Sequence, residues 1–315
     1  MRSTMVPGIR ISVVVPCYNE EGNISELYHK LNEVLGSFNQ AEIIFVDDGS
    51  TDCTSALVEK FAHEDKRVQL ISLSRNFGHQ FALKAGLDHS IGDCVISLDA
   101  DLQHPPSLIP DMIKKWNEGY DVVYTVRRDS RKLPFFKKLT SRCFYFLAKM
   151  LSSVDVHPGA ADFRLLDRSV VDVLKECRES YLYIRGLVSW AGFRQTSIEY
   201  TPDKRFAGKT KYSTGKMIRF AMAGITSFSI RPLQLSLILG IIIAGIAFIY
   251  GLYVVCIYTF TSKAVAGWTS TTASVLFIGG IQLIILGILG EYIGKTYIEN
   301  KRRPTYVIRK KHPHN

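Results

Sequence analysis

The sequence has few cysteines for its length and no closely spaced pair of them. Its 315 residues include six cysteines, none of them in a CxxC motif. This spacing argues against a zinc site and against a disulfide-stabilised scaffold. The cysteines are Cys17, Cys53, Cys94, Cys143, Cys177 and Cys256. We expect reduced thiols in a cytosolic domain.

Two long segments lack charge altogether, residues 232–262 and 264–290. A membrane-spanning helix needs about 20 apolar residues, and both segments are longer. We therefore predict two transmembrane helices, at about 232–260 and 268–290. Residues 1–10 lack the apolar core of a signal peptide, so the chain is expected to start in the cytosol.

Basic residues exceed acidic ones, 39 against 29, and they gather on both sides of the two apolar segments. The loop between these segments carries only Lys263. The positive-inside rule predicts a multi-pass protein of the plasma (inner) membrane with both termini in the cytoplasm. A basic surface can also bind nucleic acid, but clusters flanking two spans fit anionic lipid headgroups better. We expect no nucleic-acid partner.

Three regions follow from this pattern. Residues 1–229 mix charged and apolar residues as globular proteins do, and we assign them to a cytoplasmic catalytic domain with juxtamembrane helices. Residues 230–294 hold the two transmembrane helices, and 295–315 form a basic cytoplasmic tail. A hydrophobic fraction of 47% and a mean hydropathy of +0.07 exclude a disordered chain.

The first region alternates short apolar runs with helical patterns. A helix is expected over 20–35, and strands are expected at 11–15, 42–46, 68–73, 94–98 and 121–126. Short apolar strands separated by helices predict an α/β fold with a mostly parallel sheet covered on both faces. Ligands of such sheets bind beyond the carboxyl ends of the strands.

Two acidic clusters follow predicted strands at that edge. Asp47, Asp48 and Asp52 lie in one cluster, which can also be read as a turn and helix cap. Asp99 and Asp101 follow the fourth strand. Paired carboxylates suit Mg²⁺ or Mn²⁺ shared with a substrate diphosphate. A short DxD also occurs by chance, but clusters at successive strand ends favour a site. The histidines show no ligand spacing, and we assign them no metal-binding role.

Six segments carry a resemblance to a known family. They are 14–21 (VVPCYNEE), 46–52 (VDDGSTD), 98–105 (LDADLQHP), 161–165 (ADFRL), 207–213 (AGKTKYS) and 289–297 (LGEYIGKTY). The first three resemble the signatures of family 2 glycosyltransferases. The others are similar to the polyisoprenyl-phosphate type, close to bactoprenol glucosyltransferases and dolichol-phosphate mannose synthase. The resemblance implies a GT-A (Rossmann-like) catalytic domain plus a two-helix transmembrane hairpin, a nucleotide-sugar donor and a polyprenyl phosphate acceptor.

The resemblance also implies roles for individual residues. Asp48 corresponds to the aspartate that binds the nucleotide base or ribose. Asp99 and Asp101 correspond to the diphosphate–metal motif, with Mg²⁺ or Mn²⁺ as the cofactor, and Asp101 is counted as catalytic. Asp162 corresponds to the residue placed as catalytic base. The other members of the nucleotide-sugar pocket are Pro16, Tyr18, Glu20 and Gln103.

The chemistry of the acceptor qualifies the role of Asp162. A phosphate monoester is already ionised near neutral pH, because its second pKa is about 6. There is then no difficult proton to remove. Asp162 is therefore expected to orient or electrostatically tune the acceptor.

The acceptor phosphate needs cations near the membrane, and a basic stretch begins at the end of the fifth strand. A solvated helix face is the alternative for such a stretch. Relatives have phosphate contacts at about these places, although Lys137 stands where an arginine is common and cannot form a bidentate fork. The predicted acceptor-binding residues are Arg127, Lys137, Ser141, Arg205, Lys209 and Lys211.

The resemblance implies an inverting, metal-dependent enzyme that transfers one sugar to undecaprenyl phosphate or a similar lipid. Glucose from UDP-glucose is expected, because segments 159–165 and 185–190 look most like the glucosyl branch. A processive polysaccharide synthase is one alternative, but the sequence has no QxxRW motif. A non-catalytic membrane scaffold is another. Glycine-rich spans favour a homo-oligomer, and a separate flippase and a second transferase would complete the pathway.

Overall fold

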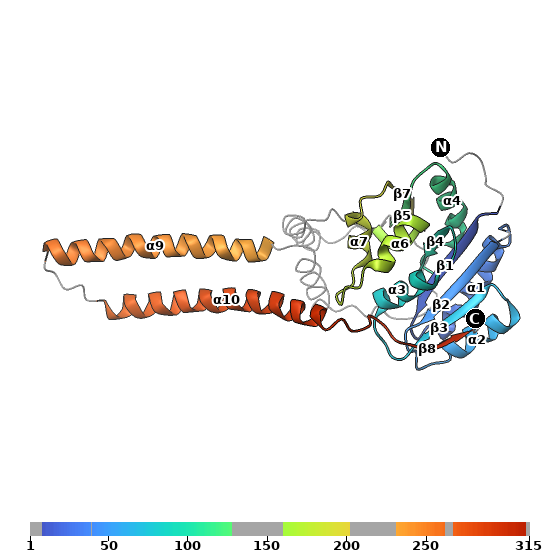
Figure 1. Cartoon of the computed structure of the whole chain (residues 1–315), viewed down its shortest axis with the longest axis horizontal. Helices are drawn as coiled ribbons and strands as arrows, with labels where there is room; N and C mark the ends of the chain where they lie inside the picture. The colour runs from blue at the N-terminus through green and yellow to red at the C-terminus, as the bar shows by residue number, and fades with distance from the viewer. Residues whose placement is uncertain (1–7, 39, 128–159, 202–230, 262–266, 313–315) are drawn as a thin grey trace. The chain divides into compact units, whose positions relative to one another are not determined.

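The computed structural model describes residues 8–38, 40–127, 160–201, 231–261 and 267–312 (Figure 1). The chain divides into two compact units. The first holds residues 1–146, 154–216 and 304–315, and the second holds 147–153 and 217–303.

The first unit is built on one eight-stranded sheet in the order β7-β5-β6-β4-β1-β2-β3-β8. Its strands are β1 (Arg10–Cys17), β2 (Gln40–Asp47), β3 (Val68–Leu73), β4 (Cys94–Ser97), β5 (Val122–Arg127), β6 (Ala160–Asp167), β7 (Gln195–Tyr200) and β8 (Ile308–His312). Only β6 and β8 run against the other strands. The sheet is therefore mostly parallel, as the sequence predicts.

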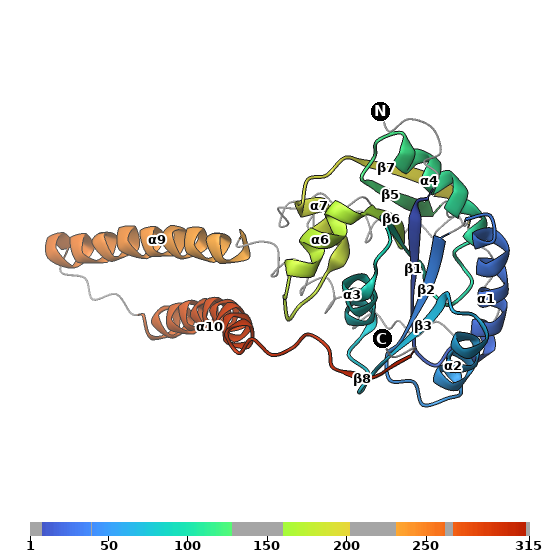
Figure 2. The same ribbon diagram turned by 45° about the vertical axis from the view of Figure 1, so that its right-hand side comes forward.

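Helices cover both faces of this sheet (Figure 2). The helices are α1 (Glu21–Leu35), α2 (Thr54–Glu64), α3 (His79–His89), the short 3-10 turn η1 (Pro106–Leu108), α4 (Ile109–Asn117), α6 (Arg168–Glu176) and α7 (Ile184–Trp190). In Figure 2, α1 and α2 lie on one side of the sheet, and α3 and α6 lie on the other. This arrangement leaves the carboxyl ends of the parallel strands as the edge where their loops meet.

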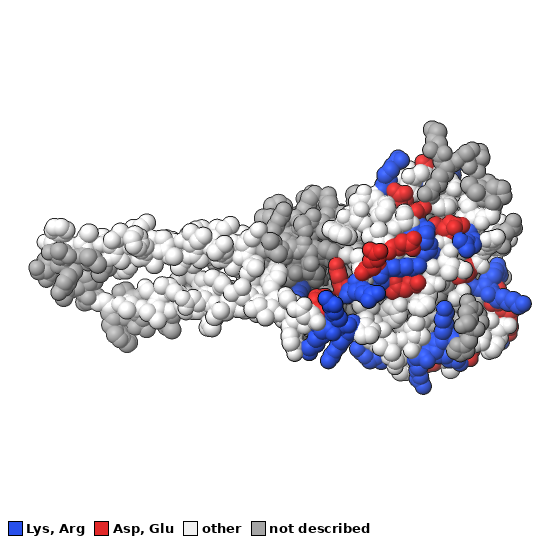
Figure 3. Space-filling model, in the orientation of Figure 1, with Lys and Arg blue, Asp and Glu red and all other residues white. Residues whose placement is uncertain are grey.

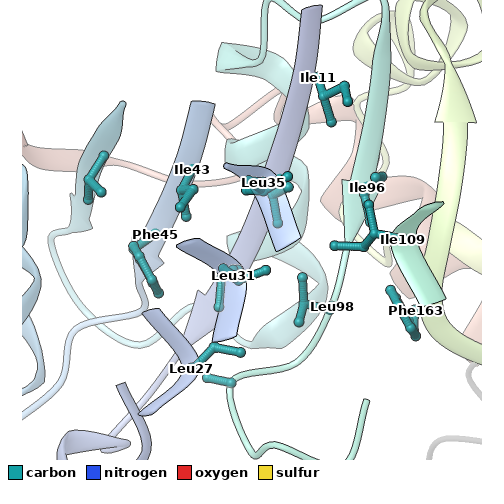
Figure 4. Packing of buried hydrophobic residues seen from close by; sticks show 14 of the residues in the cluster. Ile11, Leu27, Leu31, Leu35, Ile43, Phe45, Ile96, Leu98, Ile109 and Phe163 are labelled. Atoms are coloured by element: carbon teal, nitrogen blue, oxygen red, sulfur yellow. The ribbon is translucent and has the colours of Figure 1, made fainter. Parts of the chain in front are cut away.

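The main core lies between the sheet and the α1 face (Figure 4). Strand residues such as Phe45 and Ile96 are fully buried there, because a parallel strand covered on both faces presents apolar side chains on both. Leu27, Leu31 and Leu35 recur at a spacing of four along α1 and pack toward them.

The predicted helix and the five predicted strands are confirmed. The prediction for β3 matches to the residue, and the other elements differ by one or two residues at their ends, as expected of element boundaries. Strands β6, β7 and β8 were not predicted. Strand β8 adds to β3 at the edge of the sheet, with Leu70 opposite His312.

The second unit contains α9 (Arg231–Thr261) and α10 (Trp268–Asn300). Both are long and apolar enough to cross a membrane, over Leu233–Tyr253 and Phe277–Asn300. In Figure 3 the visible surface of α9 shows neither basic nor acidic side chains. The two helices therefore fit the predicted spans in length and composition.

Gly49, in the turn after β2, has a φ of 71° and almost no room for a side chain. A Cβ there would lie 2.6 Å from the backbone carbon of Arg75. Gly192 has a similar φ of 73°, but a Cβ there would meet nothing closer than 4.0 Å. The two glycines therefore have nearly the same φ but differ in the space available for a Cβ atom.

Gly49→Ala is expected to lower the free energy of unfolding by about 2–5 kcal/mol, because backbone strain and overpacking add. Gly192→Ala, the matched control, should cost only about 1–2 kcal/mol. Urea unfolding of both variants measures the difference. Equal losses would show that the space beside Arg75 does not restrict Gly49.

Candidate functional site

The loops after β1 and β2 are joined by hydrogen bonds. The backbone N–H of Asn19 donates to Ser50 Oγ at 3.0 Å, and that of Thr51 donates to Asn19 Oδ1 at 2.9 Å. The N–H of Glu20 donates to Thr54 Oγ1 at 2.9 Å. Asn19 takes a φ of 54°, a conformation that asparagine tolerates better than most residues. The loops after the two strands thus form one preorganised surface, called the β1–β2 wall below.

Three predicted pocket residues lie in or beside the β1–β2 wall. Pro16 is within β1, where it is buried, and Tyr18 is 38% exposed. The carboxylate of Glu20 accepts a hydrogen bond from Asn23 Nδ2 at 2.5 Å. The structure therefore brings these residues to the carboxyl edge of the sheet, where the prediction needs them.

Asp48 binds backbone groups of the segment before α3. Its two carboxylate oxygens accept from the N–H groups of Phe77 and Gly78, at 2.7 and 2.9 Å. Burial raises the pKa of Asp48, although both of these hydrogen bonds act to lower it. Asp47 accepts a hydrogen bond from the N–H of Ser50 at 3.0 Å. The acidic cluster after β2 therefore also forms a turn, which was the alternative interpretation of its sequence.

Asp99, directly after β4, is paired with His79 at the start of α3. His79 Nε2 lies 2.7 Å from Asp99 Oδ1. Burial alone would lower the pKa of His79, but the hydrogen bond and charge of Asp99 raise it to about 9. The N–H of Asp99 donates to His104 Nδ1 at 3.2 Å. Two histidines that had no assigned role therefore contact the acidic motif.

Asp99 and Asp101 fit a cation that takes most of its ligands from elsewhere. Within the described ranges, no group of three or more His, Cys, Asp or Glu side chains is arranged to hold a metal ion. Mg²⁺ needs only one or two carboxylates when substrate phosphates and water complete its shell. The donor set of Asp99 and Asp101 is of that kind.

Gln103 and Arg127 meet at the same edge, from the β4 loop and the end of β5. Arg127 Nη1 donates to Gln103 Oε1 at 3.3 Å. This contact brings a predicted donor residue and a predicted acceptor residue together. The other acceptor candidates, Lys137, Ser141, Arg205, Lys209 and Lys211, lie outside the described residues.

Asp162, on β6, is held by an arginine that was assigned no role. Arg185 Nε and Nη2 donate to its two oxygens at 2.6 and 2.8 Å. Arg164 Nη2 lies 3.8 Å from Asp162 Oδ1. Burial would raise the pKa of Asp162, but the bond and charge of Arg185, with the charge of Arg164, hold it well below its usual range.

Comparison with known proteins decides the family. Residues 12–174 match the family model of glycosyl transferase family 2. The chain belongs to this family. It is 46% identical to an uncharacterized glycosyltransferase, YkcC, of Bacillus subtilis, over 96% of this chain and 94% of that one.

Two further relatives have names that state a substrate. A prophage bactoprenol glucosyl transferase homolog of Escherichia coli is 41% identical over 96% of this chain and 99% of its own length. A prophage-derived bactoprenol glucosyl transferase of Shigella flexneri is 40% identical over 98% of this chain and all of its own. The predicted family, α/β GT-A fold and enzyme class, a glycosyltransferase, are confirmed.

Proposed function

We propose that this glycosyltransferase moves a single glucose from UDP-glucose to a polyprenyl phosphate such as undecaprenyl phosphate. The observation that carries the proposal is similarity to bactoprenol glucosyl transferases over at least 96% of the chain, a span that includes both apolar helices. A soluble donor and a membrane acceptor account for a soluble α/β unit and two apolar helices in one chain.

The strand edge supports the donor half of this proposal. Asp99 and Asp101 would hold Mg²⁺ or Mn²⁺, which supplies Lewis-acid stabilisation of the leaving diphosphate. The joined loops of β1 and β2 would hold the nucleoside, with Tyr18 contacting its base. Asp162 stays ionised and would act by charge and orientation, in keeping with an acceptor phosphate that carries no difficult proton.

A panel of donors tests the choice of sugar. The full chain, in detergent with undecaprenyl phosphate, is given radiolabelled UDP-glucose, UDP-N-acetylglucosamine or GDP-mannose. UDP-glucose should label the lipid fastest. Faster labelling by another donor would refute glucose while keeping the lipid acceptor.

Membrane sidedness belongs to the same proposal. The catalytic unit and the basic segments would stand at the cytoplasmic leaflet, so the product sugar would face the cytoplasm and need a separate flippase and a second transferase. The protein alone in sealed vesicles should leave its product open to a membrane-impermeant reagent on the catalytic side. Product on the opposite leaflet would contradict this.

Arg127→Ala is expected to raise the KM for polyprenyl phosphate about tenfold, because a charge-assisted phosphate contact is worth 1.5–3 kcal/mol in typical cases. Nucleotide affinity should change little. Arg10→Ala is the matched control, since Arg10 begins β1 at the opposite end of the strands and pairs with Asp93. Equal losses of nucleotide and acceptor binding would place Arg127 in the donor site.

A further inference from the structure

Asp162 and Arg185 form a bidentate ion pair whose two members differ in exposure. The carboxylate side chain is 10% exposed, and the guanidinium side chain is 33% exposed. Nε and Nη2 of Arg185 are engaged by Asp162. Among the described residues, Asp162 is the partner found for the hydrogen bonds of the Arg185 guanidinium. These bonds use Nε and Nη2 and leave Nη1 outside the pair, on a side chain that is 33% exposed.

The pair lies at the catalytic edge because of the strands and helices that carry it. Strand β6 runs antiparallel to β4, with Arg164 opposite Ser97. Ser97 Oγ donates to the backbone oxygen of Asp162 at 2.6 Å. Asp162 is thereby placed beside the end of β4, where Asp99 follows.

Helix α7 brings Arg185 to the same place. The N–H of Ile184, its first residue, donates to Gln80 Oε1 at 3.0 Å. Gln80 follows His79, which contacts Asp99. Segments from β6, α3 and α7 thus converge on the end of β4. Arg185 is held there by its side-chain bonds to Asp162 and by the backbone bond of its neighbour Ile184.

Two guanidinium groups meet one carboxylate in this cluster, so Arg164, Arg185 and Asp162 together carry a net charge of +1. The carboxylate of Asp99 also acts on Arg185. Both oxygens of Asp162 accept hydrogen bonds from Arg185, and these bonds stabilise the ionised carboxylate. A carboxylate in this state is a weak general base, but it is well suited to fix a guanidinium in one orientation.

We propose that Arg185 binds a substrate phosphate and that Asp162 is its positioning residue. The planar guanidinium fork matches phosphate oxygens, and phosphate is the anion that both substrates of the proposed reaction bring to this edge. The inference rests on the proposed function. The phosphate could belong to the diphosphate of the donor or to the lipid acceptor.

Arg185→Gln, Arg185→Lys and Asp162→Asn in the full chain test the proposal, with Arg194→Gln as the control. Arg194 lies over the ring of Tyr120, and its backbone N–H donates to Asp121 at the start of β5. Two quantities are measured: the Kd of UDP compared with that of UMP, and the KM for undecaprenyl phosphate. Thermal unfolding checks that each variant is folded.

Arg185→Gln should raise either the Kd of UDP or the KM for undecaprenyl phosphate about tenfold or more. Loss of UDP affinity with UMP unchanged identifies the diphosphate, and a raised acceptor KM identifies the lipid phosphate. Arg185→Lys should recover part of the loss, because it restores charge without the fork. Asp162→Asn should raise the same one of these two constants. In the double variant Asp162→Asn/Arg185→Gln, that constant should be no higher than in Arg185→Gln.

Changes below twofold in both quantities for Arg185→Gln, with wild-type transfer intact, would overturn the inference. So would an Asp162→Asn variant that loses turnover while both phosphate measurements stay at wild-type values, since that is the behaviour of a base. If Arg185→Gln fails to fold, the Arg185→Lys measurements decide by the same criteria. Absence of transfer by the wild type with every donor would instead refute the proposed function.

Discussion

Asp101→Asn is expected to lose about 10²–10³-fold in turnover while the protein remains folded. The loss should be large because the carboxylate acts where negative charge develops on the leaving diphosphate, and preorganised electrostatic groups of this kind contribute that much. Asp101 lies in the loop after β4, where its Oδ1 accepts a hydrogen bond from the backbone N–H of Gln103 at 3.2 Å. Asparagine keeps the shape and removes the charge.

Turnover of Asp101→Asn is measured with saturating donor and acceptor, and folding is followed by thermal unfolding. Asp111→Asn is the control, because Asp111 is an exposed carboxylate in the first turn of α4. It should behave as wild type. Retention of more than a third of the activity by Asp101→Asn would remove Asp101 from the catalytic residues.

Chelation is expected to abolish transfer, and either Mg²⁺ or Mn²⁺ should restore it. Asp99 and Asp101 supply only two carboxylates, so the cation depends on substrate phosphates for its affinity. EDTA should therefore also weaken the binding of UDP far more than that of uridine. Calorimetric titration of both nucleotides, with and without EDTA, measures this difference. Full activity in excess EDTA would contradict the metal assignment.

The strands that carry the donor site could be predicted because their signals are local. Strands β1 to β5 are short apolar runs, and polar clusters follow three of them. In a parallel sheet these clusters must meet at one edge, so the placement of Asp48 and Asp99 at the same edge followed from topology alone. The loop contacts of Asn19 with Ser50 and Thr51 agree with that expectation.

The rest of the sheet depends on contacts that the sequence does not show. Strand β6 inserts antiparallel between β4 and β5, and β8 pairs with β3 from 235 residues further along the chain, Leu73 opposite Ile308. Such pairings are decided by tertiary packing. Strand β8 is also rich in charge, with Arg309, Lys310 and Lys311, as is typical of an edge strand.

The two charged partners at the site were missed for different reasons. His79 has no metal-ligand spacing, and its role depends on α3 starting beside the end of β4. Arg185 is 23 residues from Asp162 along the chain, and no periodic pattern connects them. One signal was available: Asp162 and Arg164 alternate on β6, which places both on the same face of the strand.

The central claim is that the enzyme attaches one sugar to a lipid phosphate. Its most direct test is mass spectrometry of the lipid recovered after the purified full chain has acted on undecaprenyl phosphate and UDP-glucose. The account predicts a single product, the lipid phosphate carrying one hexose, with UDP released in equal amount. A lipid bearing a chain of hexoses, a polymer free of lipid, or UDP release with the lipid unchanged would contradict it.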